Sequence, residues 1–227
     1  MKIRAILTGA TGMVGEGVLL ECLLDPDVEH ILLLSRRPSG VAHPKVRELL
    51  HADLQDLSAI ENQLTGYNAC FFCAGISSVG ITKGQYEHVT YDLTLHVAET
   101  LARRNPTLTF TYVSGAGTDS RGQSRFHWAR VKGRTENALL ALPFVRAYMF
   151  RPGYLHPTPG QHYALKMYQF LGFLYPLLRR LAPARISTLR ELGQAMLAAV
   201  RVGYPKPVLE VLDIVALAAR AAGPVPA

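Results

Sequence analysis

The turn between the first apolar run and the first helical pattern constrains the fold more than any other feature. Residues 3–7 lead directly into Gly9, Gly12 and Gly15, spaced G-x-x-G-x-x-G, and an amphipathic pattern follows over residues 14–24. Glycines at this spacing permit a tight turn, a close backbone approach to a pyrophosphate, and close packing of helix on strand. The free N–H groups at the helix start then face the phosphates. The sequence therefore predicts a dinucleotide-binding turn.

The remaining apolar runs predict a parallel sheet. Runs at residues 31–34, 69–73, 108–113, 144–150 and 208–212 alternate with helical patterns at 86–104 and 126–142. Asp213 is placed to N-cap a last helix that runs through Arg220. The runs are continuously apolar, as expected for strands that are buried on both faces of a parallel sheet. We therefore expect an α/β, doubly wound Rossmann-type fold with right-handed crossovers.

Composition and length indicate one cytoplasmic domain. Of the 227 residues, 49% are hydrophobic, which is enough for a sizeable core. We expect a core over about residues 1–155 and a small C-terminal region over about 156–227 that covers the mouth of the active site. Three cysteines are too few for a disulfide framework, and the first residues contain no apolar signal core. We therefore expect a cytoplasmic protein.

Charge is distributed unevenly along the chain. The net charge is +7, but residues 1–100 hold 7 Lys or Arg against 12 Asp or Glu, and the remainder hold 17 against 5. A basic second half suits anionic small molecules, acidic lipid surfaces or nucleic acid. No zinc-finger spacing, RNP motif or basic leucine zipper is present. Nucleic acid is therefore not expected as a partner.

The end of the second predicted strand indicates the preferred cofactor. Sites that prefer NAD(H) place an Asp or Glu there, where it binds the ribose 2′-hydroxyl. Here residues 31–34 are followed by Ser35, Arg36 and Arg37. Guanidinium groups suit the charge and geometry of a 2′-phosphate. The sequence therefore predicts NADP(H) in preference to NAD(H), the alternative being that both arginines are solvated and the site is indifferent.

Several short motifs carry a family resemblance. They are Thr8-Gly9-Ala10-Thr11-Gly12-Met13-Val14-Gly15, His51-Ala52-Asp53-Leu54, Cys73-Ala74-Gly75, Ser114-Gly115-Ala116-Gly117, Lys132 and Arg151-Pro152-Gly153. With them the chain resembles an atypical or extended short-chain dehydrogenase/reductase that is NAD(P)-binding and epimerase-like, near the HTATIP2/TIP30-like oxidoreductase branch. The resemblance covers residues 1–155 and, more loosely, 209–218.

The resemblance implies where the cofactor lies. The turn residues Gly9, Thr11, Gly12, Met13, Val14 and Gly15 would hold the pyrophosphate. Asp53 and Leu54 would bracket the adenine. Cys73, Ala74 and Gly75 would line the cofactor after the fourth strand, and Pro152, Gly153 and Leu155 would lie beside the nicotinamide.

The catalytic part of the resemblance is incomplete. The family uses a Ser at the end of the fifth strand and a Tyr-x-x-x-Lys helix, in which Lys binds the ribose and Tyr transfers a proton. Ser114 and Lys132 are present, but the residue four before Lys132 is Trp128. An indole N–H donates a hydrogen bond and cannot relay a proton.

Three interpretations of Trp128 stay open. Another group supplies the proton, with His127, Tyr154, Lys132 itself or a water as candidates. The substrate needs no such acid. Or the protein binds NADPH without turnover, as a regulator or assembly factor. The enzyme interpretation is hydride transfer to a small carbonyl substrate, with Ser114 orienting the oxygen.

The other reactive residue types suggest less. Cys70 and Cys73 lie three apart on a predicted strand, so we expect two unreactive thiols. No metal site is expected, because the eight histidines show no ligand spacing. Arginines crowd residues 121–134, where they either bind an acidic substrate or face solvent.

An apolar, Arg-flanked segment at residues 162–181 has several interpretations. Its uninterrupted part, residues 170–178, is too short to span a bilayer. Three alternatives stay open for this segment. It packs over the substrate pocket, it packs against a second subunit in a homodimer, or it lies on a membrane surface as a peripheral contact.

Overall fold

The central sheet is parallel, as the apolar runs predicted. The computed structural model describes residues 1–163 and 175–221. Across these residues the main sheet has the strand order β3-β2-β1-β4-β5-β6-β9, and every neighbouring pair is parallel. The strands are β1 (Ile3–Thr8), β2 (Val28–Ser35), β3 (Val46–Leu50), β4 (Ala69–Phe72), β5 (Thr109–Val113), β6 (Arg146–Arg151) and β9 (Val208–Glu210). The direction of winding reverses between β1 and β4, which is where such sheets bind ligands.

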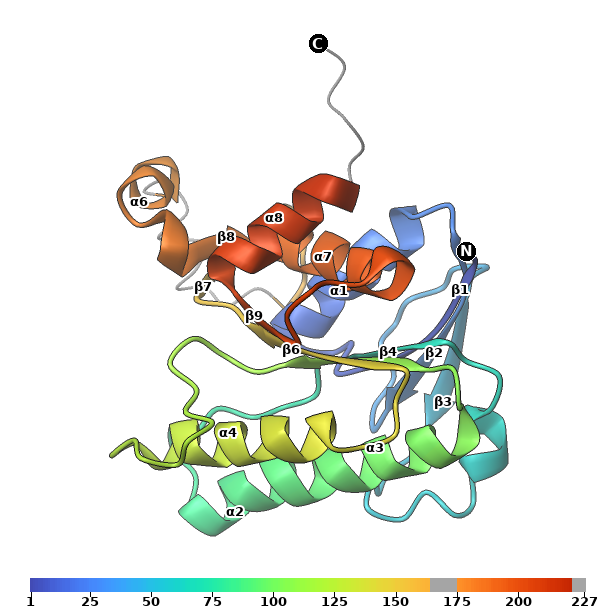
Figure 1. The fold of residues 1–227 in the computed structure, drawn as a ribbon. Helices are drawn as coiled ribbons and strands as arrows, with labels where there is room; N and C mark the ends of the chain where they lie inside the picture. Colours follow the sequence, from blue (N-terminus) through green and yellow to red (C-terminus); the bar gives the residue numbers. More distant parts are fainter. Residues whose placement is uncertain (164–174, 222–227) are drawn as a thin grey trace.

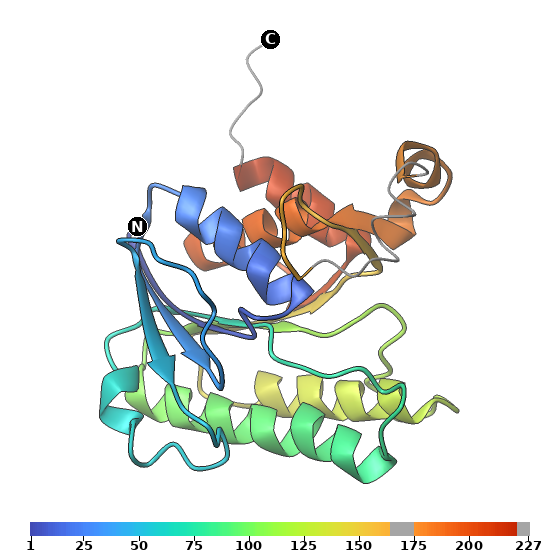
Figure 2. The same cartoon turned by 180° about the vertical axis from the view of Figure 1, so that it is seen from behind.

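Helices cover both faces of this sheet (Figures 1 and 2). One layer contains α1 (Met13–Leu24), α7 (Leu189–Val202) and α8 (Val211–Ala221). The other contains α2 (Lys83–Glu87), a π-helical turn η2 (His88–Asp92), α3 (Leu93–Arg104) and α4 (His127–Leu140). Two hydrophobic clusters fill the interior, one under each layer. The expected α/β Rossmann-type fold is confirmed.

Smaller elements complete the described chain. A second, two-stranded sheet pairs β7 (Tyr154–His156) with β8 (Ile186–Thr188). The short helices are η1 (Glu61–Leu64), α6 (Tyr175–Leu181) and η4 (Pro183–Arg185). None of the helices in residues 1–163 and 175–221 has the length and apolarity needed to cross a bilayer.

The C-terminal third returns to the core. Beyond residue 185, α7 packs on α1, and β9 extends the main sheet beside β6. In the described chain, the C-terminal region expected over residues 156–227 therefore includes elements, α7, α8 and β9, that pack with the main sheet and its helices. Much of the apolar segment 162–181 lies outside the described residues, and its described helix α6 leaves Leu177 and Leu181 exposed.

Local details differ from the expected elements. The helix expected over residues 86–104 begins at Lys83 and is interrupted by the π-helical turn, where Thr94 Oγ1 donates to the carbonyl of Val89. Asp213 does not N-cap the last helix, because α8 begins at Val211 directly after β9. Its carboxylate instead accepts from the backbone N–H of Glu210, the reach-back half of a capping box.

Candidate functional site

The glycine turn connects β1 to α1 at the reversal point of the sheet. Gly9 has a φ of +76°, and a Cβ there would lie 2.7 Å from the backbone of Cys73 and Ala74. A Cβ on Gly15 would lie 2.0 Å from the carbonyl oxygen of Gly9. The N–H of Gly12 donates to that same oxygen at 3.0 Å. Gly9 therefore permits contact with the end of β4, and Gly15 permits α1 to pack on the turn.

The N-terminus of α1 is open to a ligand. Gly12 is the N-cap residue, and no side chain caps this end of the helix. The first N–H groups of a helix have no partner within it and attract anions together with the helix dipole. Gly12 is exposed, while Met13 and Val14 are half-buried and pack against the core. A phosphate at this position would meet backbone donors without displacing a side chain.

A crevice of about 310 Å³ extends from this turn across the ends of β1, β2 and β4. We call it the dinucleotide crevice. Its lining residues are Gly9, Thr11, Gly12, Leu34, Ser35, Arg36, Arg37, Leu54, Cys73, Ala74, Gly75 and Ile76. Arg36 and Arg37 are exposed at its rim, and no Asp or Glu among the described residues lines it.

Some residues expected at the cofactor are not among the residues that line this crevice. Asp53 is exposed and accepts from the N–H of Gln55 at 2.9 Å, while its neighbour Leu54 lines the crevice. The carbonyl of Pro152 accepts from the N–H of Ala116 at 2.9 Å. Leu155 is buried in the core, so its side chain is held by packing.

Gly153 lies between Pro152 and β7. A Cβ there would lie 2.2 Å from the carbonyl oxygen of Arg185. The position therefore needs glycine for the close approach of two backbones, whatever its relation to a cofactor.

Ser114 and Lys132 meet beside the end of β5. Lys132 Nζ donates to the backbone carbonyl of Ser114 at 3.1 Å and lies 5.5 Å from the ring centre of Tyr112. Burial lowers the pKa of Lys132 to about 8, although the nearby carboxylate of Glu136 acts in the opposite direction. The Ser114 hydroxyl is 3.0 Å from that of Thr118. Lys132 can thus hold a ligand oxygen and exchange a proton near neutral pH.

Trp128 lies one helical turn before Lys132 on α4. A Cβ on Gly117, whose φ is +85°, would lie 3.4 Å from its indole ring. The indole therefore packs against the turn that follows Ser114. This places Trp128 beside the residues with which the family's tyrosine would act.

His127 and Tyr154 occupy different surroundings. His127 Nε2 lies 3.7 Å from a carboxylate oxygen of Glu87, and its ring meets Tyr86 edge-on at 6.3 Å. It therefore faces α2, whereas Lys132 faces β5. Tyr154 is half-buried on β7. The structure does not bring His127 together with Ser114 and Lys132.

A buried ion pair next to Lys132 was not anticipated from the sequence. Glu136 is fully buried and binds Arg151 at 2.5 Å, and Arg151 also reaches Glu210 at 3.1 Å. Ser120 Oγ donates to Glu136 at 3.1 Å. The available signal was the spacing of Glu136, four residues after Lys132 on the same helix. This network fixes α4 against β6.

The cysteines are thiols in an apolar setting. Cys22, Cys70 and Cys73 are all free, and burial raises the pKa of each thiol. A thiol with a raised pKa is a poor nucleophile. Among the residues that the structure describes, no three His, Cys, Asp or Glu side chains are grouped to hold a metal ion.

Comparison with known proteins places the chain in a family. The NAD dependent epimerase/dehydratase family matches residues 5–126, more than half of the chain. The chain belongs to this family. Its members bind NAD(H)-type cofactors. The finer assignment to the HTATIP2/TIP30-like branch is not established by these matches.

Curated relatives match about two thirds of the chain. The protein fmp52, mitochondrial, of Emericella nidulans is 31% identical over 157 residues, covering 65% of this chain and 64% of that protein. The leucinostatins biosynthesis cluster protein T of Purpureocillium lilacinum is 33% identical over 144 residues, covering 62% of this chain and 52% of that protein. The chain thus matches less than two thirds of either relative's length.

Solved structures share the fold. Uronate dehydrogenase from Agrobacterium tumefaciens has a TM-score of 0.64 at 17% identity, covering 92% of this chain and 76% of that one. The Bordetella bronchiseptica enzyme WbmG in complex with NAD has a TM-score of 0.68 at 13% identity, covering 100% and 81%. At these identities the likeness shows the fold alone.

The cytoplasmic localisation expected from the sequence is wrong by this comparison. Several relatives are named mitochondrial, among them those of Emericella nidulans, Scheffersomyces stipitis and Aspergillus oryzae. The expectation rested on the cysteine count and on the lack of an apolar signal core. Neither feature distinguishes the cytoplasm from other reducing compartments.

Proposed function

We propose that the chain binds NADP(H) in the dinucleotide crevice and acts as an oxidoreductase on a small carbonyl substrate. The observation that carries the cofactor choice is the end of β2. Arg36 and Arg37 line the crevice there, and in the part of the chain that the structure describes no carboxylate does. A carboxylate at this position would repel a 2′-phosphate, whereas guanidinium groups attract it.

The residues around the glycine turn suit such a cofactor. The close approaches at Gly9 and Gly15 leave no room for a Cβ, and the start of α1 has no side-chain cap. Arg36 and Arg37 would hold the 2′-phosphate, Gly12 the pyrophosphate and Leu54 the adenine. When bound, NADPH would supply a hydride to a carbonyl carbon.

The residues at the end of β5 would position the substrate. Lys132 would hold the nicotinamide ribose from its place beside the Ser114 carbonyl. The Ser114 hydroxyl would orient the substrate oxygen, with Thr118 as its hydrogen-bond partner. We expect substrate-dependent NADPH oxidation that Lys132→Met abolishes.

Trp128 favours a second candidate function. A site that binds NADPH but has no tyrosine could serve a non-catalytic regulator or assembly factor, whose cofactor sets a conformation for a partner. The variant Trp128→Tyr separates the two functions. Wild-type turnover of model carbonyls supports the enzyme. Turnover that appears only in Trp128→Tyr supports the non-catalytic function, because the wild-type site then lacks only the tyrosine that transfers the proton.

Thermal unfolding with NADPH, NADH or neither tests the cofactor. Ligand at about 100 times its Kd stabilises a protein by roughly 2.7 kcal/mol, or about 5–10 °C for a chain of this size. We expect that shift with NADPH and a smaller one with NADH. Equal shifts would refute the role of Arg36 and Arg37. No shift, together with no absorbance near 340 nm released on denaturation, would refute NADPH binding.

A further inference from the structure

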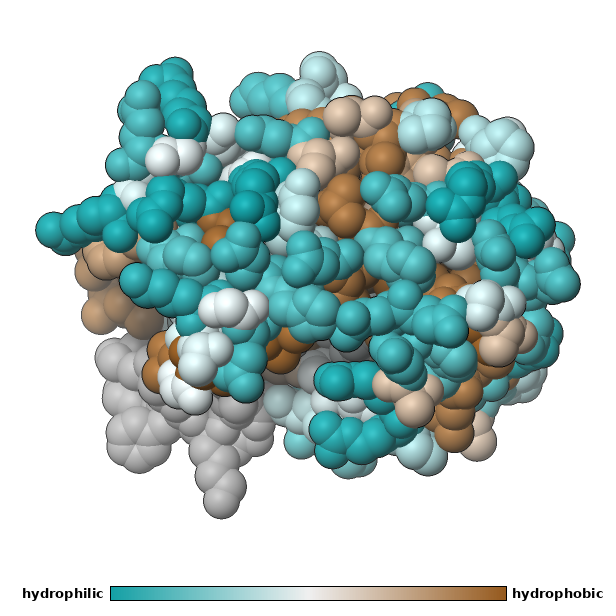
Figure 3. All heavy atoms as spheres, turned by 90° about the horizontal axis from the view of Figure 1, so that it is seen from below, coloured by the Kyte–Doolittle hydropathy of each residue, from teal (hydrophilic) through white to brown (hydrophobic). Residues whose placement is uncertain are grey.

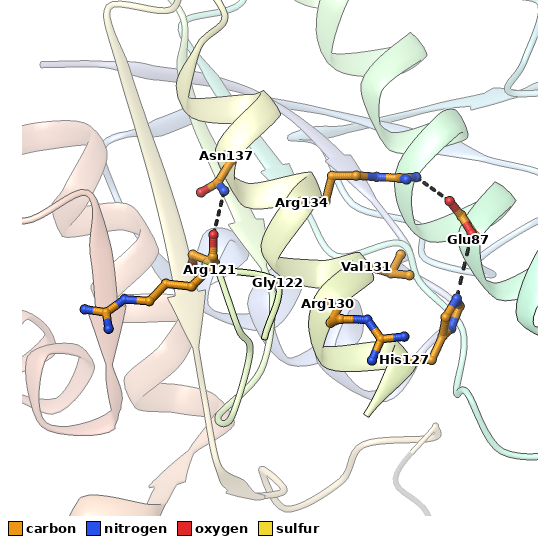
Figure 4. Close-up of a pocket in the computed structure, with 9 residues that line it drawn as sticks. Glu87, Arg121, Gly122, His127, Arg130, Val131, Arg134 and Asn137 are labelled. Carbon is orange, nitrogen blue, oxygen red and sulfur yellow. Dashed lines mark hydrogen bonds and ion pairs between the residues drawn. The ribbon is translucent and has the colours of Figure 1, made fainter. Parts of the chain in front are cut away.

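A second hollow lies along α4 (Figure 4). Among the described residues, none lines both this hollow and the dinucleotide crevice. The second hollow has a volume of about 420 Å³, which is in the range of small-molecule sites. We call it the arginine hollow. Its lining residues are Glu87, Ser120, Arg121, Gly122, His127, Arg130, Val131, Arg134 and Asn137.

One face of α4 supplies the basic side chains of this hollow. His127, Arg130 and Arg134 are three and four residues apart, so they follow one stripe of the helix. The loop over residues 120–122 forms one wall, and Glu87 of α2 stands opposite. Val131 is buried and forms an apolar part of the lining. His127, Arg130 and Arg134 of the basic stretch therefore gather at this hollow, while Arg121 and Arg125 are exposed.

Arg134 and His127 are held in place by the same carboxylate. Arg134 Nη2 lies 2.6 Å from Glu87, and its guanidinium stacks 3.8 Å above the ring of Tyr91. His127 approaches Glu87 from the other side, as Figure 4 shows. A guanidinium fixed by one ion pair and one ring loses less freedom when it binds a ligand.

Arg130 is held by one hydrogen bond and keeps further N–H donors for a ligand. Its Nη1 donates to the carbonyl of Ser124. An arginine carries five N–H donors, so this bond leaves others for a ligand. Arg121 extends away from the other arginines (Figure 4). Arg130, Arg134 and His127 are thus the basic groups gathered at the hollow, and they are opposed by the carboxylate of Glu87.

The surroundings favour a charged occupant. Figure 3 shows the outer face of the α2, α3 and α4 layer, which is dominated by hydrophilic residues. Arginine binds phosphate oxygens through paired N–H groups, and two arginines four apart on a helix can bind one phosphate together. An apolar partner would have to desolvate these charges without replacing their hydrogen bonds.

We propose that the arginine hollow binds a phosphate-bearing small molecule, with the phosphate between Arg130 and Arg134. His127 contributes a further polar contact to the same ligand. The site is separate from the dinucleotide crevice, so the proposal stands whether or not the chain is an oxidoreductase.

Titration calorimetry with inorganic pyrophosphate at low ionic strength tests this site. We expect binding that persists at saturating NADPH, and at least a tenfold loss of affinity in Arg130→Gln and in Arg134→Gln. Arg134→Lys keeps the charge but loses the paired donors, and we expect an intermediate loss. It also keeps the test decisive if Arg134→Gln does not fold.

Arg104→Gln is the matched control. Arg104 pairs with Glu61 at 3.0 Å on the same helical layer but outside the hollow, and we expect affinity within twofold of wild type. Equal binding by all variants would overturn the proposal, as would no binding. A third outcome would also overturn the proposal. If the protein does not bind pyrophosphate, and sedimentation shows a dimer that Arg134→Gln dissociates, the hollow is a contact with a second copy of the chain.

Discussion

Removing the charge of Glu136 tests whether the buried ion pair stabilises the fold. Glu136 is fully buried, and the side chain of Arg151 is 13% exposed. Glu136→Gln keeps the volume but leaves Arg151 without its buried partner. Breaking a buried pair in this way costs about 3–5 kcal/mol. The exposed Glu210 remains 3.1 Å from Arg151, so we expect the low end, about 3 kcal/mol.

Urea unfolding at constant pH measures this loss, since the midpoint falls in proportion to stability when the m-value is unchanged. Glu61→Gln is the matched control, because Glu61 pairs with Arg103 and Arg104 at the surface. Surface pairs contribute 0–1 kcal/mol, so the control should lose about 1 kcal/mol or less. A loss in Glu136→Gln no larger than in Glu61→Gln would refute the assignment of a stabilising buried pair.

Three further predictions follow from the site. Gly15→Ala places a Cβ 2.0 Å from the Gly9 carbonyl oxygen, so we expect it to lower the free energy of unfolding by about 2 kcal/mol or more and to abolish NADPH binding. In the control Gly84→Ala, the new Cβ meets no atom within 4 Å beyond its chain neighbours and its own helix backbone, and urea unfolding should show neutral or increased stability. The double variant Arg36→Gln, Arg37→Gln should weaken NADPH binding about 10–100-fold, as measured by calorimetry, and leave the affinity for NADH within about twofold of wild type. An equal loss of affinity for the two cofactors would contradict the role of these arginines at the 2′-phosphate. The pKa of Lys132 is about 8 in the folded state against about 10.4 unfolded, so the unfolded chain binds more protons between these values. The difference in the free energy of unfolding between wild type and Lys132→Met should therefore rise from pH 8 to pH 10, by up to about 1.4 kcal/mol per pH unit. A difference that does not change with pH would show that burial does not lower the pKa of this lysine.

Features encoded locally could be predicted from the sequence. The glycine spacing and the continuous apolar runs predicted β1, α1 and the parallel sheet, because each depends on neighbours in the chain. Because Arg36 and Arg37 follow the apolar run at residues 31–34, the sequence also places them at the same edge of the sheet as Gly9. The structure brings these residues to one crevice.

Features that depend on distant partners could not be predicted in this way. The helix α7 was missed although Thr188 and Glu191 form a capping box before it. Its burial against α1 is a tertiary contact. The short β3 shows little apolar pattern of its own, since Leu49 is its one buried residue. The charge of Glu136 gave no sign of burial, because Glu136 lies on α4 and its partner Arg151 lies on the separate element β6.

The two sides of α4 limit the sources of a proton. His127 and Trp128 are adjacent in sequence, so their side chains are about 100° apart around the helix. Trp128 and Lys132 lie on the side of α4 that faces β5, and His127 and Arg134 lie on the side that faces α2. His127 would have to leave Glu87 and cross the helix to reach a substrate beside Ser114. If the chain turns over a carbonyl substrate, the proton therefore comes from Lys132, Tyr154 or water, and His127→Gln should leave that turnover unchanged while weakening anion binding at the arginine hollow.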